Sequence, residues 1–107
     1  MLRLVREQKV IPLMEAIAKL SYLQAKWLEP MVPDMRHRGR LQKGAIADII
    51  IFDANTVKDT SDWKEGMNSL PSEGIPYVIV NGTVVVKDFK VLKGVYPGQP
   101  IPNAMLN

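Results

Sequence analysis

The chain has 107 residues, of which 47% are hydrophobic and 23% charged, which fits one globular domain or part of one and excludes a disordered chain. At 12.0 kDa it is too short for a complete (β/α)8 enzyme barrel, which usually needs about 250 residues. Fourteen lysines and arginines against 11 aspartates and glutamates leave a formal charge of +3, too small a surplus to predict a nucleic-acid or membrane partner. The lack of cysteine excludes disulfides, thiolate nucleophiles and cysteine-ligated metals.

The first residues, Met1-Leu2-Arg3-Leu4-Val5-Arg6-Glu7, are amphipathic and soon charged, a pattern that predicts no secretory signal peptide. The longest apolar runs have only a few residues, far fewer than the roughly 20 that cross a bilayer. We therefore expect a cytoplasmic protein.

The first part of the chain has the pattern of helices. Apolar residues recur at helical spacing over residues 13–20, and Pro12 suits the first turn of that helix. Ser21, followed three residues later by Gln24, predicts a capping box that starts a second helix. That helix should end before Pro30, and residues 30–44, rich in proline and glycine, should connect it to the rest.

The second part has the pattern of strands and loops. Residues 47–53, Ala-Asp-Ile-Ile-Ile-Phe-Asp, lack strict alternation, so we expect a strand covered on both faces. Residues 54–74 predict a long ordered loop, and we expect Trp63 to hold it down.

Two strand-like runs, residues 77–80 and 83–87, are joined by Asn81-Gly82, which predicts a hairpin with a type I′ turn. Asp88-Phe89 should turn the chain again into residues 90–92. The prolines and glycine of residues 97–102 then predict an extended tail without regular pairing.

The candidates for metal or acid–base chemistry are few. His37 is the single histidine and lies between two arginines, which disfavours a bound cation, so we interpret it as a loop residue without a catalytic role. Asp48 and Asp53 flank a strand, where turn and terminus hydrogen bonding is the ordinary role. Asp59 and Asp62 lack the dense oxygen-ligand pattern of a calcium site and are interpreted as solvated carboxylates.

Two further motifs have a structural and a functional interpretation. The basic stretch Arg36, His37, Arg38, Arg40 and Lys43 could grip phosphate, but no aromatic residue lies among them to stack on a base. A solvated linker, or an arginine in a structural ion pair, is therefore favoured over nucleic-acid binding. Asn81-Gly82-Thr83 matches the glycosylation pattern, but the hairpin turn needs the same Asn-Gly, and we favour the turn.

One long block of the sequence resembles a known family. Residues 38–53, Arg-Gly-Arg-Leu-Gln-Lys-Gly-Ala-Ile-Ala-Asp-Ile-Ile-Ile-Phe-Asp, are similar to the C-terminal end of metal-dependent amidohydrolases, where G-x-L-x-x-G-x-x-A-D leads into a hydrophobic strand and F-D. The upstream residues 5–25 and the downstream Pro71-Ser72, Gly74-Ile75, residues 77–82 and Pro97-Gly98 resemble the D-aminoacylases, also called N-acyl-D-amino-acid deacylases. The tail architecture is shared by dihydroorotase-like and hydantoinase-like enzymes. Asp88-Phe89 stands where such tails usually have Asp-Gly, which favours a turn of another type.

The resemblance implies an α+β fold in two parts. Residues 1–33 would be terminal helices of a TIM-like barrel, and residues 34–107 the C-terminal share of a composite antiparallel β-sandwich with an extended tail. The family's other sandwich strands come from its extreme N-terminus, and its metal centre, with zinc or a similar divalent ion, belongs to barrel strands upstream. No catalytic, cofactor-binding or metal-binding residue is therefore transferred to this chain.

The resulting hypothesis is a C-terminal, non-catalytic fragment of an amidohydrolase whose full-length parent hydrolyses C–N amide bonds of N-acyl-D-amino acids. Its expected partners are the missing N-terminal part of the parent or a second copy of itself, with neither nucleic acid nor membrane. The alternative hypothesis is a stand-alone protein-interaction or assembly module without enzymatic activity, because a half-sandwich exposes strand edges and apolar faces.

Overall fold

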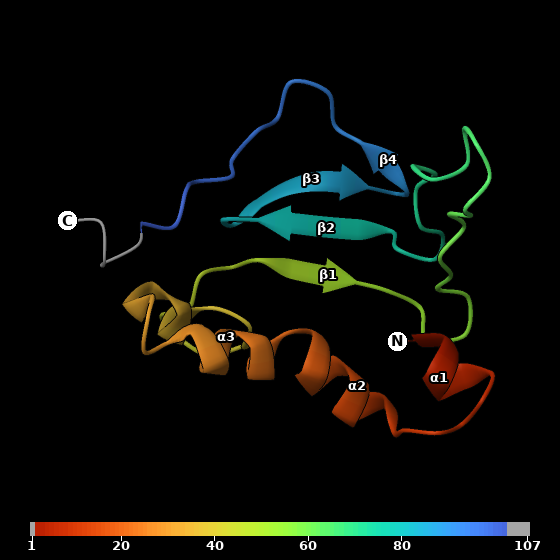
Figure 1. The fold of residues 1–107 in the computed structure, drawn as a ribbon. Coiled ribbons are helices and arrows are strands. Elements are labelled where there is room, and N and C mark those ends of the chain that lie inside the picture. Colours follow the sequence, from red (N-terminus) through yellow and green to blue (C-terminus); the bar gives the residue numbers. More distant parts are fainter. Residues whose placement is uncertain (1, 103–107) are drawn as a thin grey trace.

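The structure, a computed structural model, describes residues 2–102, and side chains from residue 4 onward. Three α-helices and one 3-10 helix precede a four-stranded antiparallel sheet, so the chain is of the α+β class, as expected (Figure 1). The helices are α1 (Leu2–Arg6), α2 (Leu13–Leu20), α3 (Tyr22–Leu28) and the 3-10 helix η1 (Pro33–His37). None of these helices is long and apolar enough to cross a membrane.

The predicted helices form, but their junction differs from a capping box. Pro12 lies just before α2 in an extended conformation and is its N-cap. At the junction, the Ser21 hydroxyl donates backward to the Ile17 carbonyl (2.8 Å), and Gln24 Nε2 donates to the Lys19 carbonyl (3.2 Å). The capping-box prediction is therefore wrong. Because the Ser21 backbone N–H still bonds to the Ile17 carbonyl, the chain runs from α2 into α3 with little interruption.

The segment after α3 is more ordered than predicted. The helix ends at Leu28, before Pro30, as expected. Within the predicted connecting segment, however, Pro33 starts the short 3-10 helix η1, because proline fixes a backbone angle suited to the first helical turn. The chain then crosses α3 closely at Gly39, where an added Cβ would lie 2.7 Å from the Ser21 carbonyl oxygen and 2.9 Å from the Ala25 Cβ.

The sheet is a meander of four strands in the order β1-β2-β3-β4. Its strands are β1 (Ile49–Ile51), β2 (Tyr77–Val80), β3 (Thr83–Lys87) and β4 (Lys90–Val91). Asn81 and Gly82 have positive φ angles of 48° and 79°, which confirms the predicted hairpin with a two-residue turn of the type I′ kind. Val80 pairs with Thr83 across that turn, and a bulge interrupts the register between Val78 and Ile79.

The turn between β3 and β4 contradicts the expectation of another turn type. Asp88 and Phe89 also have positive φ angles, 50° and 66°, as a type I′ turn requires. The Tyr77 hydroxyl donates to Asp88 Oδ1 at 2.8 Å, and the Phe89 backbone N–H donates to the Pro76 carbonyl at 3.2 Å. These two contacts with the neighbouring segment compensate for the absence of glycine. After β4 the chain turns at residues 93–94, and residues 97–102 then form no regular pairing, as predicted, while residues 103–107 lie outside the described residues.

The strands are less covered than the sequence predicts. Ile50 and Ile51 point to opposite faces of β1, and their surfaces are 58% and 48% exposed. The prediction that this strand is covered on both faces is therefore wrong for the chain by itself. The residues of β2 are half-buried along the whole strand.

The long loop is ordered, but not by its tryptophan. Trp63 is fully exposed, so the prediction that it holds the loop down is wrong. The loop closes instead through its two ends: Lys58 and Glu73 form an isolated antiparallel bridge, and the Thr60 hydroxyl donates to the Pro71 carbonyl at 2.7 Å. Backbone pairing of the two ends leaves the tip free to project outward.

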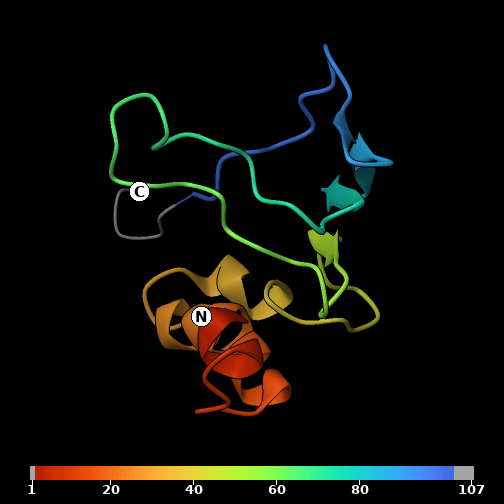
Figure 2. The same cartoon turned by 90° about the vertical axis from the view of Figure 1, so that its right-hand side faces the viewer.

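The helices and the sheet form two layers that meet at the β1 side of the sheet (Figure 2). Arg6 at the end of α1 donates to the carbonyls of Asn55 (2.9 Å) and Val57 (2.8 Å), and Arg38 pairs with Asp48. The loop of residues 54–74 and the C-terminal segment extend on one side of the sheet. Side-chain contacts to loops, rather than a helix packed on a sheet face, therefore join the two layers.

The chain has a small core. Among residues 4–102 the buried side chains are only Ala16, Ala25 and Val57. The chain exposes 8507 Å², whereas a compact protein of its mass exposes about 6,000 Å². Its radius of gyration is 15.7 Å, against about 13 Å for a compact domain of this length. The molecule is thus more open than a self-contained domain of its size.

Candidate functional site

Two arginines of the basic stretch are engaged in ion pairs. Arg38 Nη1 donates to Asp48 Oδ2 at 2.6 Å, and Arg40 Nη2 donates to Glu29 Oε1 at 2.5 Å. The Arg40 guanidinium also lies over the ring of Tyr22, 5.0 Å from its centroid. The interpretation of structural ion pairs is therefore confirmed for these two arginines.

Glu29 is the acidic centre of the second ion pair. Besides Arg40, Lys26 Nζ donates to its other oxygen at 3.0 Å. The hydrogen bond from Arg40, followed by that from Lys26, holds the pKa of Glu29 below its ordinary value. Two cations thus stabilise the ionised carboxylate, and the ion pair with Glu29 holds Arg40 against the end of α3.

The remaining basic residues are exposed. Arg36 and His37 lie in η1, and Lys43 lies in the following turn. The backbone carbonyl of His37 accepts a hydrogen bond from the Ile46 N–H at 2.8 Å. The structure therefore places His37 on the surface, at the end of a 3-10 helix rather than in an irregular loop.

The strand-flanking carboxylates have the predicted structural roles. Asp48 accepts the backbone N–H of Asn81 (2.8 Å) through the oxygen that does not bind Arg38. Asp53 Oδ1 accepts the backbone N–H of Asn55, two residues on, at 2.9 Å. Both carboxylates therefore serve turn and terminus hydrogen bonding.

The loop carboxylates do not converge on a common point. Asp59 accepts the hydroxyl (2.7 Å) and the backbone N–H (3.0 Å) of Ser61, and the hydroxyl is the main cause of its lowered pKa. Asp62 instead accepts the backbone N–H of Trp63 at 2.7 Å. In the part of the chain that the structure describes, no three histidine, aspartate or glutamate side chains are grouped so that they could hold a metal ion.

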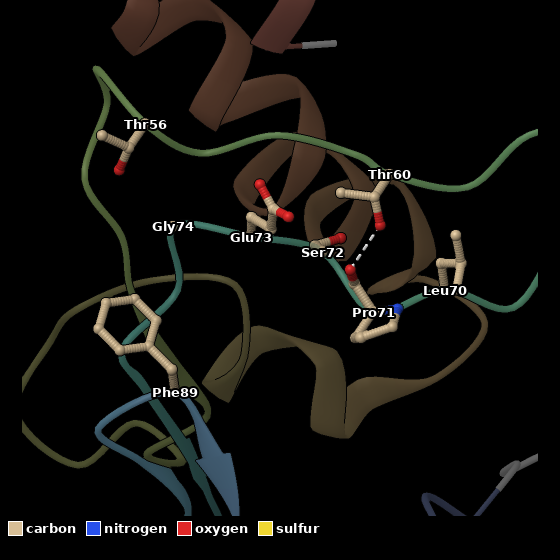
Figure 3. Close-up of a pocket in the computed structure, with 8 residues that line it drawn as sticks. All are labelled: Thr56, Thr60, Leu70, Pro71, Ser72, Glu73, Gly74 and Phe89. Carbon is tan, nitrogen blue, oxygen red and sulfur yellow. Dashed lines mark hydrogen bonds between the residues drawn. The ribbon is translucent and has the colours of Figure 1, made fainter.

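A shallow pocket lies where the ends of the long loop meet the β3–β4 turn (Figure 3). It has a volume of about 680 Å³ and is lined by Thr56, Thr60, Leu70, Pro71, Ser72, Glu73, Gly74 and Phe89. The sequence does not predict this pocket, because the Lys58–Glu73 bridge brings its two walls together from distant positions. No local motif marks that pairing.

The chemistry of this pocket is limited. Glu73 is its one ionisable lining residue, and the hydroxyl of Thr60 already donates to the Pro71 carbonyl. A nucleophile with a neighbouring base, or an acid–base pair, requires a second titratable group within hydrogen-bond reach. The residues that line the pocket therefore offer neither of these catalytic arrangements.

Comparisons with known proteins link the chain to one enzyme. It is 42% identical over 83 residues to N-acyl-D-glutamate deacylase from Alcaligenes xylosoxydans xylosoxydans. This similarity supports a D-aminoacylase-related origin. The match covers 78% of this chain but only 16% of the deacylase. No protein-family model and no solved structure matches the chain significantly.

Proposed function

We propose that the chain is a C-terminal, non-catalytic part of a metal-dependent amidohydrolase of the D-aminoacylase type. The observation that carries the proposal is the 42% identity to a deacylase of which the chain spans only 16%. The complete protein would hydrolyse the amide C–N bond of N-acyl-D-amino acids, and this chain would contribute to its scaffold. A cytoplasmic location is part of the same proposal.

The exposed apolar surface supports a scaffold role. Strands without alternating polarity are typical of sheets that are covered on both faces, yet Ile50 and Ile51 are about half exposed here. The surface in excess of a compact protein is about 2,500 Å², more than the roughly 800 Å² per partner of a standard interface. In the complete protein, further polypeptide would cover this surface.

The proposed anatomy divides the chain near residue 33. Residues 1–33 would be the terminal helices of a barrel, and residues 34–107 a share of a composite β-sandwich. A catalytic zinc usually has three protein ligands, and the described residues offer no group that fits such a set. We therefore place the metal ligands and the catalytic groups on polypeptide outside this chain.

A fragment-complementation experiment tests the proposal. The deacylase relative would be produced without the segment that matches this chain, alone and together with the 107-residue chain. We expect metal-dependent deacylation of an N-acyl-D-amino acid only when both polypeptides are present. Deacylation by the purified chain alone would refute the non-catalytic assignment, and failure of the pair to regain activity would count against the scaffold role.

The second candidate is a stand-alone interaction module that pairs with another copy of the chain. The exposed tryptophans favour it, because Trp27 and Trp63 are 73% and 101% exposed and tryptophan is enriched in binding hot spots. Light scattering across a concentration series distinguishes the two candidates. A dimer with no gain of activity in the complementation experiment would favour the interaction module.

A further inference from the structure

The turn between β2 and β3 carries a reactive dipeptide that the proposed function does not use. In an Asn-Gly sequence the backbone nitrogen of glycine readily attacks the asparagine side chain, because glycine has no side chain to hinder the approach. Asn81 and Gly82 form this dipeptide, and both are exposed. Asn68 is also exposed but is followed by Ser69, so it serves as a comparison within the same chain.

We propose that Asn81 is a site of deamidation that the folded turn holds back. In the first step the Gly82 nitrogen forms a bond to Asn81 Cγ and the Cγ–Nδ2 bond breaks. Ammonia leaves with the side-chain nitrogen, its two hydrogens and the hydrogen of the Gly82 amide. Water then opens the cyclic imide at either carbonyl and gives aspartate or isoaspartate, so no oxidant or reductant is needed.

In the folded turn, hydrogen bonds hinder the approach of the Gly82 nitrogen to Asn81 Cγ. The Gly82 N–H, which must be given up in the reaction, donates to the Ala47 carbonyl at 2.9 Å. The backbone N–H of Asn81 donates to Asp48 Oδ1 at 2.8 Å, and its side-chain nitrogen contacts the Pro97 carbonyl at 3.4 Å. Reaction therefore requires a local opening that frees the turn from the segment before β1.

The product would weaken the turn that produced it. A carboxylate at position 81 has no hydrogen to donate, so the contact that the Asn81 side-chain nitrogen makes with the Pro97 carbonyl would be lost. Isoaspartate also lengthens the main chain within a two-residue turn, which disturbs the pairing of Val80 with Thr83. Deamidation thus loosens the joint between the hairpin and the segment that carries Asp48.

The test follows deamidation of the 107-residue chain by peptide mapping and mass spectrometry at mildly alkaline pH, in buffer and in urea. In urea we expect Asn81 to react faster than Asn68. In buffer Asn81 should react slower than in urea by about tenfold, which corresponds to an opening that costs ~1.4 kcal/mol. Equal rates at Asn81 and Asn68 in urea, or at Asn81 in buffer and urea, would overturn the proposal.

A pair of variants tests the role of the turn contacts. Asp48→Ala removes the acceptor for the Asn81 N–H and should raise the rate at Asn81 in buffer while leaving the rate in urea unchanged. Asp62→Ala, whose carboxylate bonds within the long loop, is the matched control and should change neither rate. If Asp48→Ala unfolds the chain, its rate in buffer rises to the rate in urea, which agrees with the proposal. An unchanged rate in buffer contradicts it.

Discussion

Asp48 and Arg38 form a 2.6 Å ion pair that ties the segment after the helices to the start of the sheet. The other oxygen of Asp48 binds the Asn81 backbone N–H, so one carboxylate joins two parts of the chain that are 33 residues apart. Because the described residues include few buried side chains, the contacts of Asp48 are important for holding the helices against the sheet.

Replacing Arg38 should weaken this joint. Its side chain is 20% exposed and that of Asp48 is 40% exposed, so the pair is partly screened by solvent. We expect Arg38→Ala to lower the free energy of unfolding by about 1 kcal/mol, measured by urea denaturation. Arg36→Ala, a change at an exposed neighbour, is the control and should leave stability unchanged. Equal stability of the two variants would show that the pair contributes nothing.

Gly74 is required by a close approach as well as by its backbone conformation. Its φ is +77°, and an added Cβ would lie 2.5 Å from the backbone nitrogen and Cα of Val57. Gly74→Ala should therefore cost about 3 to 5 kcal/mol.

Gly66 provides a matched control for that change. Its φ is +79°, but an added Cβ would meet no atom within 4 Å, so Gly66→Ala should cost only the conformational strain of about 1 to 2 kcal/mol. The difference between the two unfolding free energies measures the clash alone. If the two alanine variants are equally stable, the packing of Gly74 on Val57 is looser than described.

Ile50→Asp should have different effects in the isolated chain and in the proposed complete protein. Because Ile50 is 58% exposed, the substitution should cost less than about 1 kcal/mol in the 107-residue chain. In the complementation pair the same face would be covered, and an unpaired buried charge should then abolish assembly and activity. Val91→Asp, on the opposite edge strand and 73% exposed, tests whether any exposed strand position behaves in this way.

Acidification should lower the free energy of unfolding by removing the ion pairs of Glu29. The pKa of Glu29 is lower in the folded chain, chiefly because of Arg40, so the folded state binds fewer protons than the unfolded state. Its stabilising contribution is present above the ordinary glutamate pKa of about 4.3 and is lost as the pH falls through the lowered value. Unfolding free energies across this range should fall for the parent chain and less steeply for Glu29→Gln. Identical profiles would contradict the assignment.

The stabilising contact of Tyr77 should be lost as the pH rises, whereas that of Glu29 is lost as the pH falls. Its hydrogen bond to Asp88, reinforced by the charge of that carboxylate, raises the pKa of Tyr77. The contribution of this contact is present below the ordinary tyrosine pKa of about 10 and is lost as the pH rises through the raised value. Spectrophotometric titration of phenolate formation, with Tyr77→Phe as the reference, gives the measurement. A Tyr77 that titrates at the ordinary value would show that the bond is absent in solution.

Local patterns predicted the elements well, because each depends on a few neighbouring residues. Asn81-Gly82 specifies its turn, and Pro30 ends its helix. The wrong or missing predictions concern contacts between residues that are distant in the sequence. Trp63 was expected to hold the long loop in place, but nothing in the described chain covers it. The Lys58–Glu73 bridge that closes the loop has no local sequence signal. Phe89 keeps a backbone conformation usual for glycine because Pro76 and Tyr77, at the start of β2, form hydrogen bonds with its turn.

Trp63 also gives the molecule an optical reporter of its surroundings. The fluorescence of a fully exposed indole has the long emission wavelength of tryptophan in water. Trp27 is 73% exposed, so its emission should also lie at long wavelengths. Any polypeptide that covers the tip of the long loop would shift this emission to shorter wavelengths and shield it from a soluble quencher. Association of the chain can therefore be followed by fluorescence without attaching a dye.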